Sequence, residues 1–360
     1  MSAVSGKGVT IVVDAMGGDY APGINVKGSL MALKAASDLR VFLVGNQDIL
    51  KEELKKNGGS ESERLQLVHS EEVISMEDHA ASGIRKKKNS SIHVGLKLVK
   101  DREADAFVSA GNSGAVMAGA LLTLGRLADV ERPAILIRLP TAEGFIIILD
   151  AGANVDCKPS HLEQFAEMGH VYAQVIEGIS QPRIGLISNG SETHKGNELT
   201  RGTHDLLRAH QDLTYVGYVE GYDLFKGVAD VAVCDGFVGN VILKTSEGLA
   251  KASLQWFRKE IRRDIFGLMG VVLMRKILRA FKNKFDYEPY GAAPLVGIDG
   301  MVLISHGSST EVAIESGILA AKRGVEQDFI SKIRKQLGSR REAPGKASDG
   351  KNLGATARNE

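Results

Sequence analysis

Pro182-Arg183-Ile184-Gly185-Leu186-Ile187-Ser188-Asn189-Gly190-Ser191-Glu192-Thr193-His194-Lys195-Gly196-Asn197-Glu198 is the stretch from which the fold can be inferred. Its apolar run, Ile184–Ile187, is typical of a short buried strand, and Asn197 suits the cap of a following helix. The polar loop between them contains two glycines and a lysine. Backbone N–H groups, a helix N-terminus and a fixed positive charge together suit phosphate or another small anion. The alternative is an ordinary surface loop with a solvated lysine.

The order of strand, polar loop and helix recurs on both sides of this stretch. Runs such as Val9–Asp14 and Phe145–Leu149 are continuously apolar up to the strand end, which indicates strands covered on both faces. Strands that alternate with helices predict an α/β fold with a largely parallel sheet. Ligands bind beyond the carboxyl ends of such strands. The candidate binding residues at these ends are Asp14, Gly17, Gly18, Asn112, Ser113, Asp150, Asn154, Ser188, Asn189, Gly190, Gly196, Asn197 and Asp235, with Lys195, Asn240, His194 and His306 as candidate catalytic residues.

The composition is that of a globular protein without a strong charge bias. The 360 residues are 43% hydrophobic and carry a formal net charge of +1, so nothing indicates a nucleic-acid partner. The two cysteines, Cys157 and Cys234, fit a reducing cytoplasm rather than a disulfide framework. The N-terminus lacks the apolar core of a signal peptide. We therefore expect a cytoplasmic protein that is at most peripheral to a membrane.

One segment departs from this pattern. Residues 265–274 are uncharged and very apolar, and the apolar side chains continue on one helical face to Phe285 beside a wholly basic polar face. This pattern is typical of a helix at a membrane interface, although a dimer-interface or core helix with snorkelling lysines is an equal alternative. The membrane-contact candidates are Phe266, Leu268, Met269, Val272, Leu273, Ile277, Leu278 and Phe281. We expect one domain over residues 1–337, with a helical hairpin at about 250–286, and a disordered tail over 338–360.

Several common catalytic signatures are missing from the sequence. No G-x-G-x-x-G follows the first strand, and no phosphate-binding P-loop, H-E-x-x-H or C-x-x-C occurs. Gly111-Asn112-Ser113-Gly114 is not the G-x-S-x-G turn of hydrolases. We therefore expect neither a metal nor a cofactor. The remaining polar set contains anion binders and amide donors.

Six motifs in this order resemble the bacterial phosphate acyltransferases of phospholipid synthesis, over roughly residues 8–335. They are Asp14-Ala15-Met16-Gly17-Gly18-Asp19, Ser109-Ala110-Gly111-Asn112-Ser113-Gly114-Ala115, Asp150-Ala151-Gly152-Ala153-Asn154, Lys195-Gly196-Asn197-Glu198, Asp235-Gly236-Phe237-Val238-Gly239-Asn240 and residues 291–300. Departures are small, since that family often has Thr in place of Ser113 and Val in place of Ala151.

The resemblance implies a three-layer α/β/α fold like that of phosphotransacetylase and isopropylmalate dehydrogenase, with a homodimer as the working unit. It also implies transfer of a long acyl chain from acyl carrier protein to inorganic phosphate. A downstream membrane glycerol-3-phosphate acyltransferase would use the acyl phosphate to make lysophosphatidic acid. A membrane-contacting hairpin is known in the family, and residues 265–285 are similar to it.

The residues then suggest roles that agree with this reaction. Lys195 would hold phosphate with backbone N–H groups near Gly190 and Gly196, and Asn240 and Asn112 would orient phosphate or the acyl carbonyl. His194 or His306 would protonate the leaving thiolate. The basic run Arg85–Lys88 would meet the acidic carrier protein, unless it is only a solvated loop. The alternatives are a phosphate acetyl- or butyryltransferase that uses coenzyme A, a hydroxyacid dehydrogenase of the same fold, and a membrane scaffold without catalysis.

Overall fold

The computed structural model describes residues 8–261, 263, 270–271, 273–278, 281 and 292–342, without the side chains of 339–342. The strands are β1 (Thr10–Asp14), β2 (Arg40–Gly45), β3 (Leu65–His69), β4 (Ala106–Ser109), β5 (Ala134–Ile135), β6 (Ile137–Pro140), β7 (Phe145–Leu149), β8 (Arg183–Ile187), β9 (Thr214–Val219), β10 (Val231–Val233), β11 (Ala292–Val296) and β12 (Met301–Ser305). The helices are α1 (Gly23–Ala35), α2 (Gln47–Lys56), α3 (Ala80–Lys86), α4 (Ser91–Lys100), α5 (Ser113–Thr123), α6 (Pro159–Val175), α7 (Glu198–Ala209), η1 (Asp223–Phe225), α8 (Gly236–Ile261), α10 (Glu311–Glu326) and α11 (Phe329–Glu342).

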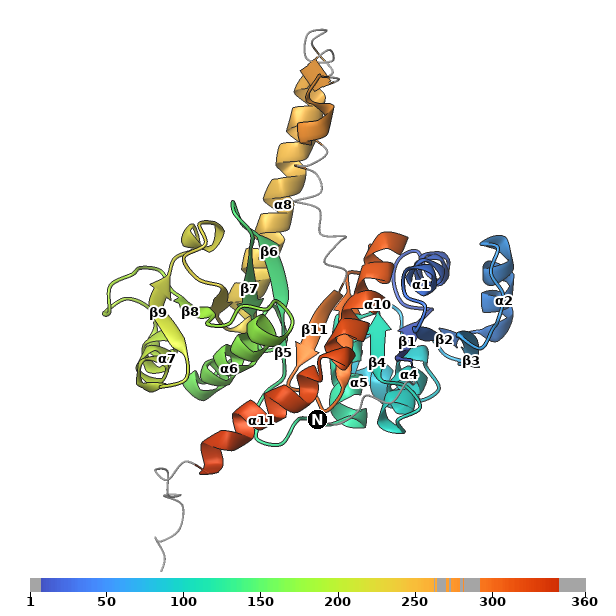
Figure 1. Ribbon diagram of the computed structural model, residues 1–360, viewed down its shortest axis with the longest axis horizontal. Coiled ribbons are helices and arrows are strands. Elements are labelled where there is room, and N and C mark those ends of the chain that lie inside the picture. The colour runs from blue at the N-terminus through green and yellow to red at the C-terminus, as the bar shows by residue number, and fades with distance from the viewer. Residues whose placement is uncertain are drawn as a thin grey trace, which may run out of the picture.

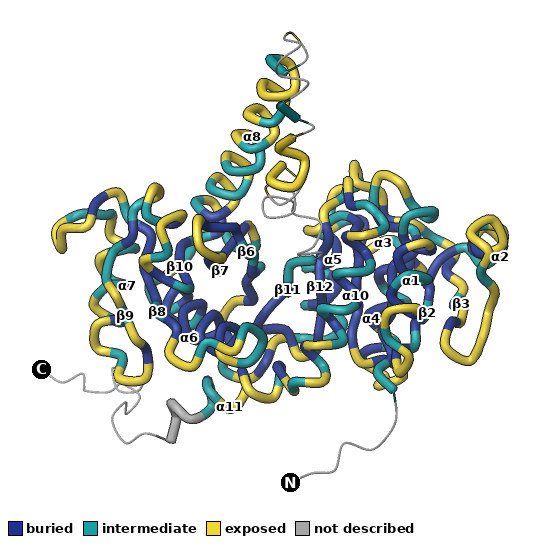
Figure 2. Tube along the Cα trace, turned by 45° about the horizontal axis from the view of Figure 1, so that its top comes forward, coloured by how far each residue is buried: buried dark blue, intermediate teal, exposed yellow. Residues whose placement is uncertain are grey.

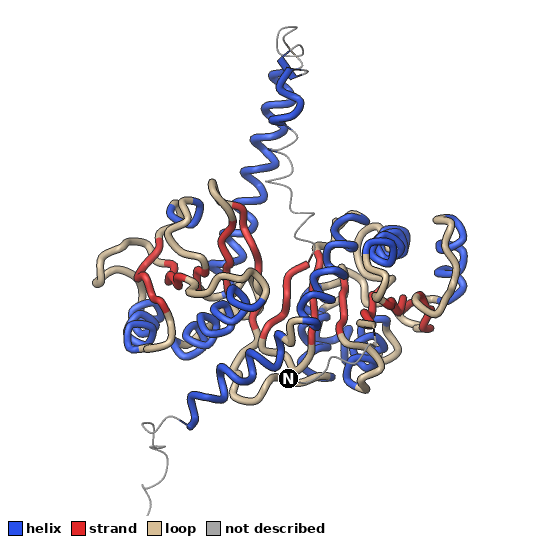
Figure 3. The backbone as a smooth tube through the Cα atoms, in the orientation of Figure 1, coloured by secondary structure: helices blue, strands red, loops and turns tan. Residues whose placement is uncertain are grey.

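The strands form two sheets rather than one continuous sheet (Figure 3). One has seven strands in the order β3-β2-β1-β4-β12-β11-β5, and the other has five in the order β6-β7-β10-β8-β9. Most neighbours are parallel, and the antiparallel pairs involve β11 with β12 and β5, and β6 with β7. The predicted α/β fold with a largely parallel sheet is therefore confirmed, but the chain divides it into a seven-stranded half and a five-stranded half.

Both sheets are covered on both faces, as their continuous apolar strands require. On β1, Ile11 and Val13 pack toward α1 and α10, whereas Val12 packs toward α4 and α5. In the five-stranded half, α6 covers one face and the first turns of α8 pack on the other. The central strands of both sheets are among the most buried parts of the chain (Figure 2).

The two halves are joined at the middle of the molecule. Residues 134–140 pair with β11 through β5 and with β7 through β6, so one extended stretch belongs to both sheets. At the other end of the chain, α11 leaves the seven-stranded half and packs on α6, where the Tyr172 and Phe329 rings meet edge to face at 5.6 Å (Figure 1). Each half is thus held to the other by backbone pairing and by helix packing.

The structure corrects two details of the sequence-based expectation. Helix α11 continues to Glu342, so the predicted start of the disordered tail at Gly338 is too early. Residues 343–360 lie outside the described part. Strand β11 was not predicted, because its sequence, Ala-Ala-Pro-Leu-Val, combines small residues with a proline. Beyond its first turns, helix α8 projects away from both sheets (Figure 1). The hairpin predicted at about 250–286 stays a prediction, because much of it lies outside the described residues.

Candidate active site

The predicted strand-end loops of the seven-stranded half do come together. β1, β4 and β12 are adjacent and parallel, so their carboxyl ends share one edge. A Cβ atom on Gly17 would lie 2.6 Å from the Gly111 nitrogen, which shows how closely the first two loops pack and why glycine is required there. The third loop joins them through the Asp19 N–H, which donates to the Gly307 carbonyl over 2.8 Å.

The buried Asp14 side chain holds the loops after β1 and β4 in place. Its carboxylate is buried and accepts hydrogen bonds from the Ser109 hydroxyl (2.7 Å) and the Met16 N–H (3.2 Å). Burial raises the pKa of Asp14, and the hydrogen bonds from Ser91 and Ser109 oppose that rise. We therefore interpret Asp14 as a residue that positions the loops around Gly17 and Gly18 rather than one that touches a ligand.

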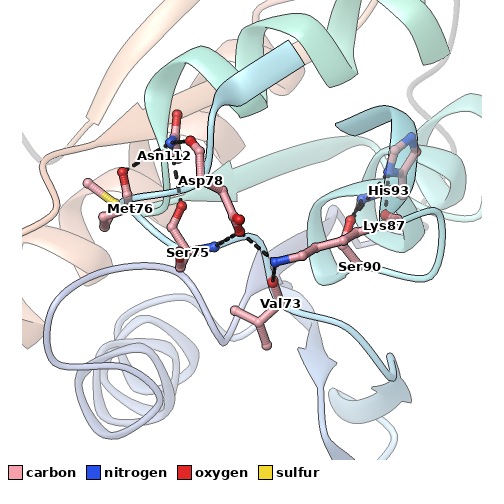
Figure 4. Close-up of polar contacts among 8 residues, drawn as sticks. All are labelled: Val73, Ser75, Met76, Asp78, Lys87, Ser90, His93 and Asn112. Atoms are coloured by element: carbon pink, nitrogen blue, oxygen red, sulfur yellow. Dashed lines mark hydrogen bonds and ion pairs between the residues drawn. The ribbon is translucent and has the colours of Figure 1, made fainter. Parts of the chain in front are cut away.

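Asn112 is also engaged within the protein. As the cap of α5, it accepts a hydrogen bond from the Ala115 N–H (3.1 Å), and its amide donates to the Asp78 carbonyl over 3.0 Å. Asp78 in turn pairs with Lys87 at 2.5 Å and accepts from the Ser75 N–H at 2.7 Å (Figure 4). Asn112 thus fastens the loop of residues 73–78 beside the strand ends, while its neighbour Ser113 faces the cavity described below.

Asp150 plays the corresponding part in the five-stranded half. Its buried carboxylate accepts from the N–H groups of Ile135, Gly152, Ala153 and Asn154 and from the Asn154 side chain, at 2.7–3.2 Å. Burial raises the pKa of Asp150, and these hydrogen bonds oppose the rise. The resulting turn packs directly on α8, because a Cβ atom on Gly239 would lie 1.9 Å from the Asp150 carbonyl oxygen.

The loop after β8 encloses a cavity of about 470 Å³ against the start of α8. Asn197 caps α7 by accepting from the Thr200 N–H (2.9 Å), and Asn189 accepts from the Gly196 N–H (2.9 Å). The Ser188 hydroxyl is buried and has no hydrogen-bond partner within the described part of the chain. The predicted residues that line this cavity are Ser188, Asn189, Gly196, Asn197 and Asp235.

Lys195 belongs to the loop after β8, and its ammonium group has only a weak contact with the rest of that loop. Its aliphatic chain packs over Gly190, and its Nζ lies 3.9 Å from Glu192 Oε1, at the outer limit of an ion pair. Because the lysine side chain is 39% exposed and the glutamate 56%, the ammonium group remains available to a bound anion. His194, next to it, is exposed.

A second and larger cavity, of about 1,100 Å³, runs between the two halves and along α8. We call it the groove. Five predicted residues line it. Ser113, Asn240 and His306 come from α5, α8 and the loop after β12, and the other two, Leu278 and Phe281, were predicted as membrane contacts. Asn240 and Val238 lie on opposite sides of the helix, so the groove and the smaller cavity flank the first turns of α8. The structure therefore places some of the predicted residues on two adjoining cavities, whereas others, Lys195 and His194 among them, do not line either cavity.

Lys244, which the sequence did not single out, completes the contact across the groove. Its Nζ lies 3.4 Å from His306 Nε2, and its ion pair with Glu247 measures 3.1 Å. His306 Nδ1 lies 3.1 Å from the Ser308 nitrogen and 2.8 Å from the Ser308 hydroxyl, and its Nε2 faces Lys244 across the groove. Only the helical spacing of four residues from Asn240 to Lys244 could have signalled this lysine.

The predicted membrane-contact residues are partly described. Leu273, Ile277, Leu278 and Phe281 are helical and exposed, with Leu273 at 85%, whereas Phe266, Leu268, Met269 and Val272 lie outside the described residues. Among the described helices, none has the length and apolar content needed to cross a membrane.

Comparison with known proteins gives a consistent result. The family described as "Fatty acid synthesis protein" matches residues 9–332. The phosphate acyltransferase of Pelotomaculum thermopropionicum is 48% identical over 330 residues, which cover 91% of this chain and 95% of the relative. The chain belongs to this family. Another member, from Geobacter sulfurreducens, is 47% identical over 331 residues, with 91% and 95% covered.

Solved structures show the family's fold in other enzymes. A phosphotransacetylase from Streptococcus pyogenes superposes with a TM-score of 0.59 at 18% identity and covers 89% of this chain and 95% of its own. A branched-chain phosphotransacylase from Enterococcus faecalis has a TM-score of 0.52 at 16% identity, with 88% and 99% covered. The three-layer α/β/α fold is therefore confirmed.

Proposed function

We propose that this protein transfers a long-chain fatty acyl group from acyl carrier protein to inorganic phosphate and so forms acyl phosphate for phospholipid synthesis. The observation that carries the proposal is the pairing of two cavities around the start of α8. The smaller one has the features of an anion site, and the larger one is a mainly apolar groove that can hold an acyl chain. The names of the family's members support the same reaction.

The chemistry requires little from the protein beyond positioning. Phosphate groups lose a proton near pH ~6, so a phosphate oxygen is already a nucleophile at neutral pH. It attacks the thioester carbonyl carbon, the C–S bond breaks, and the thiolate, whose parent thiol has a pKa of ~8.5, takes up a proton. Holding phosphate against the carbonyl and stabilising the oxyanion supply the rate enhancement. Lys195 and Lys244 would provide the positive charge, Asn240 would provide the amide donor, and His306 would deliver the proton.

The test is product formation from purified protein, phosphate and palmitoyl-acyl carrier protein, with hydroxylamine to trap acyl phosphate. Palmitoyl-coenzyme A runs in parallel. We expect phosphate-dependent hydroxamate from the carrier-protein donor. Hydroxamate from coenzyme A thioesters alone would favour a phosphotransacetylase-like activity, and no product from either donor would favour a non-catalytic membrane scaffold.

The basic run is proposed to bind the acidic carrier protein through three of its four residues. Arg85, Lys86 and Lys88 are exposed, whereas Lys87 is engaged with Asp78. Reversing the three exposed charges should raise KM for the acyl donor at low salt and less so at high salt. Reversing Lys51 and Lys55 on α2 is the matched control. An unchanged KM would exclude this surface.

Helix α8 is proposed to join two copies of the chain. It exposes four apolar side chains that do not line the groove, namely Phe237, Val241, Leu249 and Trp256, with Leu249 at 68% and Trp256 at 59%. Exposed apolar side chains in this number mark an interaction site. Leu249→Glu with Trp256→Glu should convert a dimer to a monomer in light scattering, and a monomeric wild type would refute the proposal.

The adjoining segment with Leu273 and Ile277 is proposed to bring the cytoplasmic protein to the membrane surface. At the membrane surface, the acyl phosphate made by this protein would pass to a membrane glycerol-3-phosphate acyltransferase. Leu273→Glu with Ile277→Glu should reduce co-sedimentation with anionic lipid vesicles, without loss of acyl transfer in solution. Equal sedimentation of both proteins would exclude this segment.

A further inference from the structure

The groove extends away from Asn240 and His306 in two directions. Along α8 it follows Ala250, Leu254 and Phe257, which we call the outer limb. Between the two halves it follows α10, β11 and the end of α6, and we call this part the inner limb. Because α8 projects away from both sheets (Figure 1), the limbs lead to opposite ends of the cavity, and one acyl tail can occupy only one of them.

The inner limb begins at the candidate reaction centre. Its wall on the seven-stranded side is one face of α10, where Ala313, Ser316, Ala320 and Arg323 recur at spacings of three or four residues and Leu319 lies beside them. The loop that carries His306 leads directly into this helix. Ala313, Ser316 and Ala320 are small, so this row leaves room for a ligand along the helix axis, with Leu319 at its side.

The length of this face matches a membrane-lipid acyl chain. From Thr310 to Ala320 the helix rises about 15 Å, and to Arg323 about 20 Å. One acyl chain spans half of the ~30 Å hydrocarbon core of a bilayer, or about 15 Å. A tail whose carboxyl end lies beside His306 therefore reaches the level of Ala320.

Charged groups close the far end of the inner limb. Arg138 Nη1 pairs with Glu177 Oε1 at 3.0 Å, and the guanidinium lies over the Phe145 ring at 4.0 Å. Tyr172, fixed edge to face against Phe329, forms the wall beside them. A methyl end that advanced further would desolvate these charges, which is costly. The limb thus has a defined depth, whereas the outer limb runs along the exposed length of α8.

We propose that the acyl tail lies in the inner limb, and that Ala320 and Ser316 set the longest chain that the enzyme accepts. This proposal rests on the proposed acyl transfer and adds the residues that determine its substrate range. Bulk at Ala320 would exclude the end of a long tail, and bulk at Ser316, one helical turn closer to His306, would exclude more of it.

The test compares donors rather than total activity. We expect Ala320→Phe to lower kcat/KM for palmitoyl-acyl carrier protein at least ~10-fold, because each excluded methylene costs about fourfold. The decanoyl donor should stay within about threefold of wild type, since its tail is shorter than the distance to Ala320. Ser316→Phe should lower activity with the lauroyl donor as well. Ala320→Leu, a smaller change, should shift the preference in the same direction and covers the case in which the phenylalanine variant does not fold.

Ala250→Phe makes the same change in the outer limb and is the matched control. The deciding quantity is the ratio of kcat/KM for the palmitoyl donor to kcat/KM for the decanoyl donor. If this ratio changes in Ala250→Phe but stays within about twofold of wild type in both Ala320 variants, the inner-limb proposal alone is overturned. Wild-type protein that forms no hydroxamate with any donor would overturn the proposed function, and this proposal with it.

Discussion

Each half of the molecule organises its strand ends around one buried aspartate, but the two aspartates have different partners. Asp14 in the seven-stranded half accepts hydrogen bonds from two hydroxyl groups as well as from main-chain N–H groups. Asp150 in the five-stranded half accepts five hydrogen bonds, all from N–H groups. A hydroxyl can reverse its direction and accept instead, whereas an N–H group can only donate.

This difference indicates how strongly each turn depends on a negative charge. The Asp150 turn fixes the entry to α8 and, with it, Asn240 and Lys244. The Asp14 turn fixes the loops of β1 and β4, and these hold the loop of His306 through Gly307. The five-stranded half would therefore supply the charged groups that bind substrate, and the seven-stranded half the proton donor and the groove wall.

The largest effect should come from the groups that each half presents to substrate. Lys195→Ala should reduce kcat/KM by at least ~10²-fold if the lysine stabilises the developing charge. His306→Gln should cost less than ~10-fold, because a thiolate leaving group needs little protonation. Steady-state kinetics with the carrier-protein donor measure both. A loss of kcat/KM below about threefold for Lys195→Ala would show that this lysine is not part of the site. A loss for His306→Gln that exceeds the loss for Lys195→Ala would reverse the roles proposed for the two halves.

The aspartates themselves provide a direct comparison. Asp150→Asn should destabilise the protein by about 3 kcal/mol, because the new amide group would face N–H donors and leave them without an acceptor. Asp14→Asn should cost about 1 kcal/mol, since the Ser109 hydroxyl can turn to accept. Urea unfolding measures both, with Asp101→Asn on the surface as the control. Equal losses at the two positions would contradict the role given to the hydroxyl partners.

The smallest effect concerns pH. Because burial raises the pKa of Asp14, the folded protein holds this proton to a higher pH than the unfolded chain does. The native state therefore binds more protons, and this contribution to stability falls as the pH rises from about 4 through the raised native pKa. Melting temperatures of wild type should decline relative to those of Asp14→Asn over that range. A relative rise would show that the hydrogen bonds outweigh burial.

The sequence predicted the elements better than the site. Continuous apolar runs located the long parallel strands, and Asn197 caps a helix as its position indicated. β11 and the helical continuation past Gly338 were missed because neither has a strong apolar period. The division into two sheets depends on which strands pair, and local patterns contain little information about pairing.

Within the site, sequence reasoning identified which residues gather but not what they contact. Asp14, Asn112, Asp150 and Asn154 follow strands, as predicted, yet their polar atoms bond to the protein itself. A sequence cannot distinguish such a residue from a ligand-binding one, because both need the same side chain at the same strand end. Lys244 was missed for the converse reason, since only its spacing of four residues from Asn240 distinguishes it from other exposed helical lysines.

The strand order also dictates how the chain can fold as it is synthesised. β12 lies between β4 and β11 in the seven-stranded sheet, although almost two hundred residues separate its sequence from that of β4. During translation the edge of β4 that pairs with β12 stays unpaired until β12 is synthesised. Residues 137–233 emerge earlier and can complete the five-stranded sheet first. We therefore expect a ribosome-bound chain to protect the later half before the earlier one. Such an unpaired strand edge is also where aggregation would begin if translation stalled.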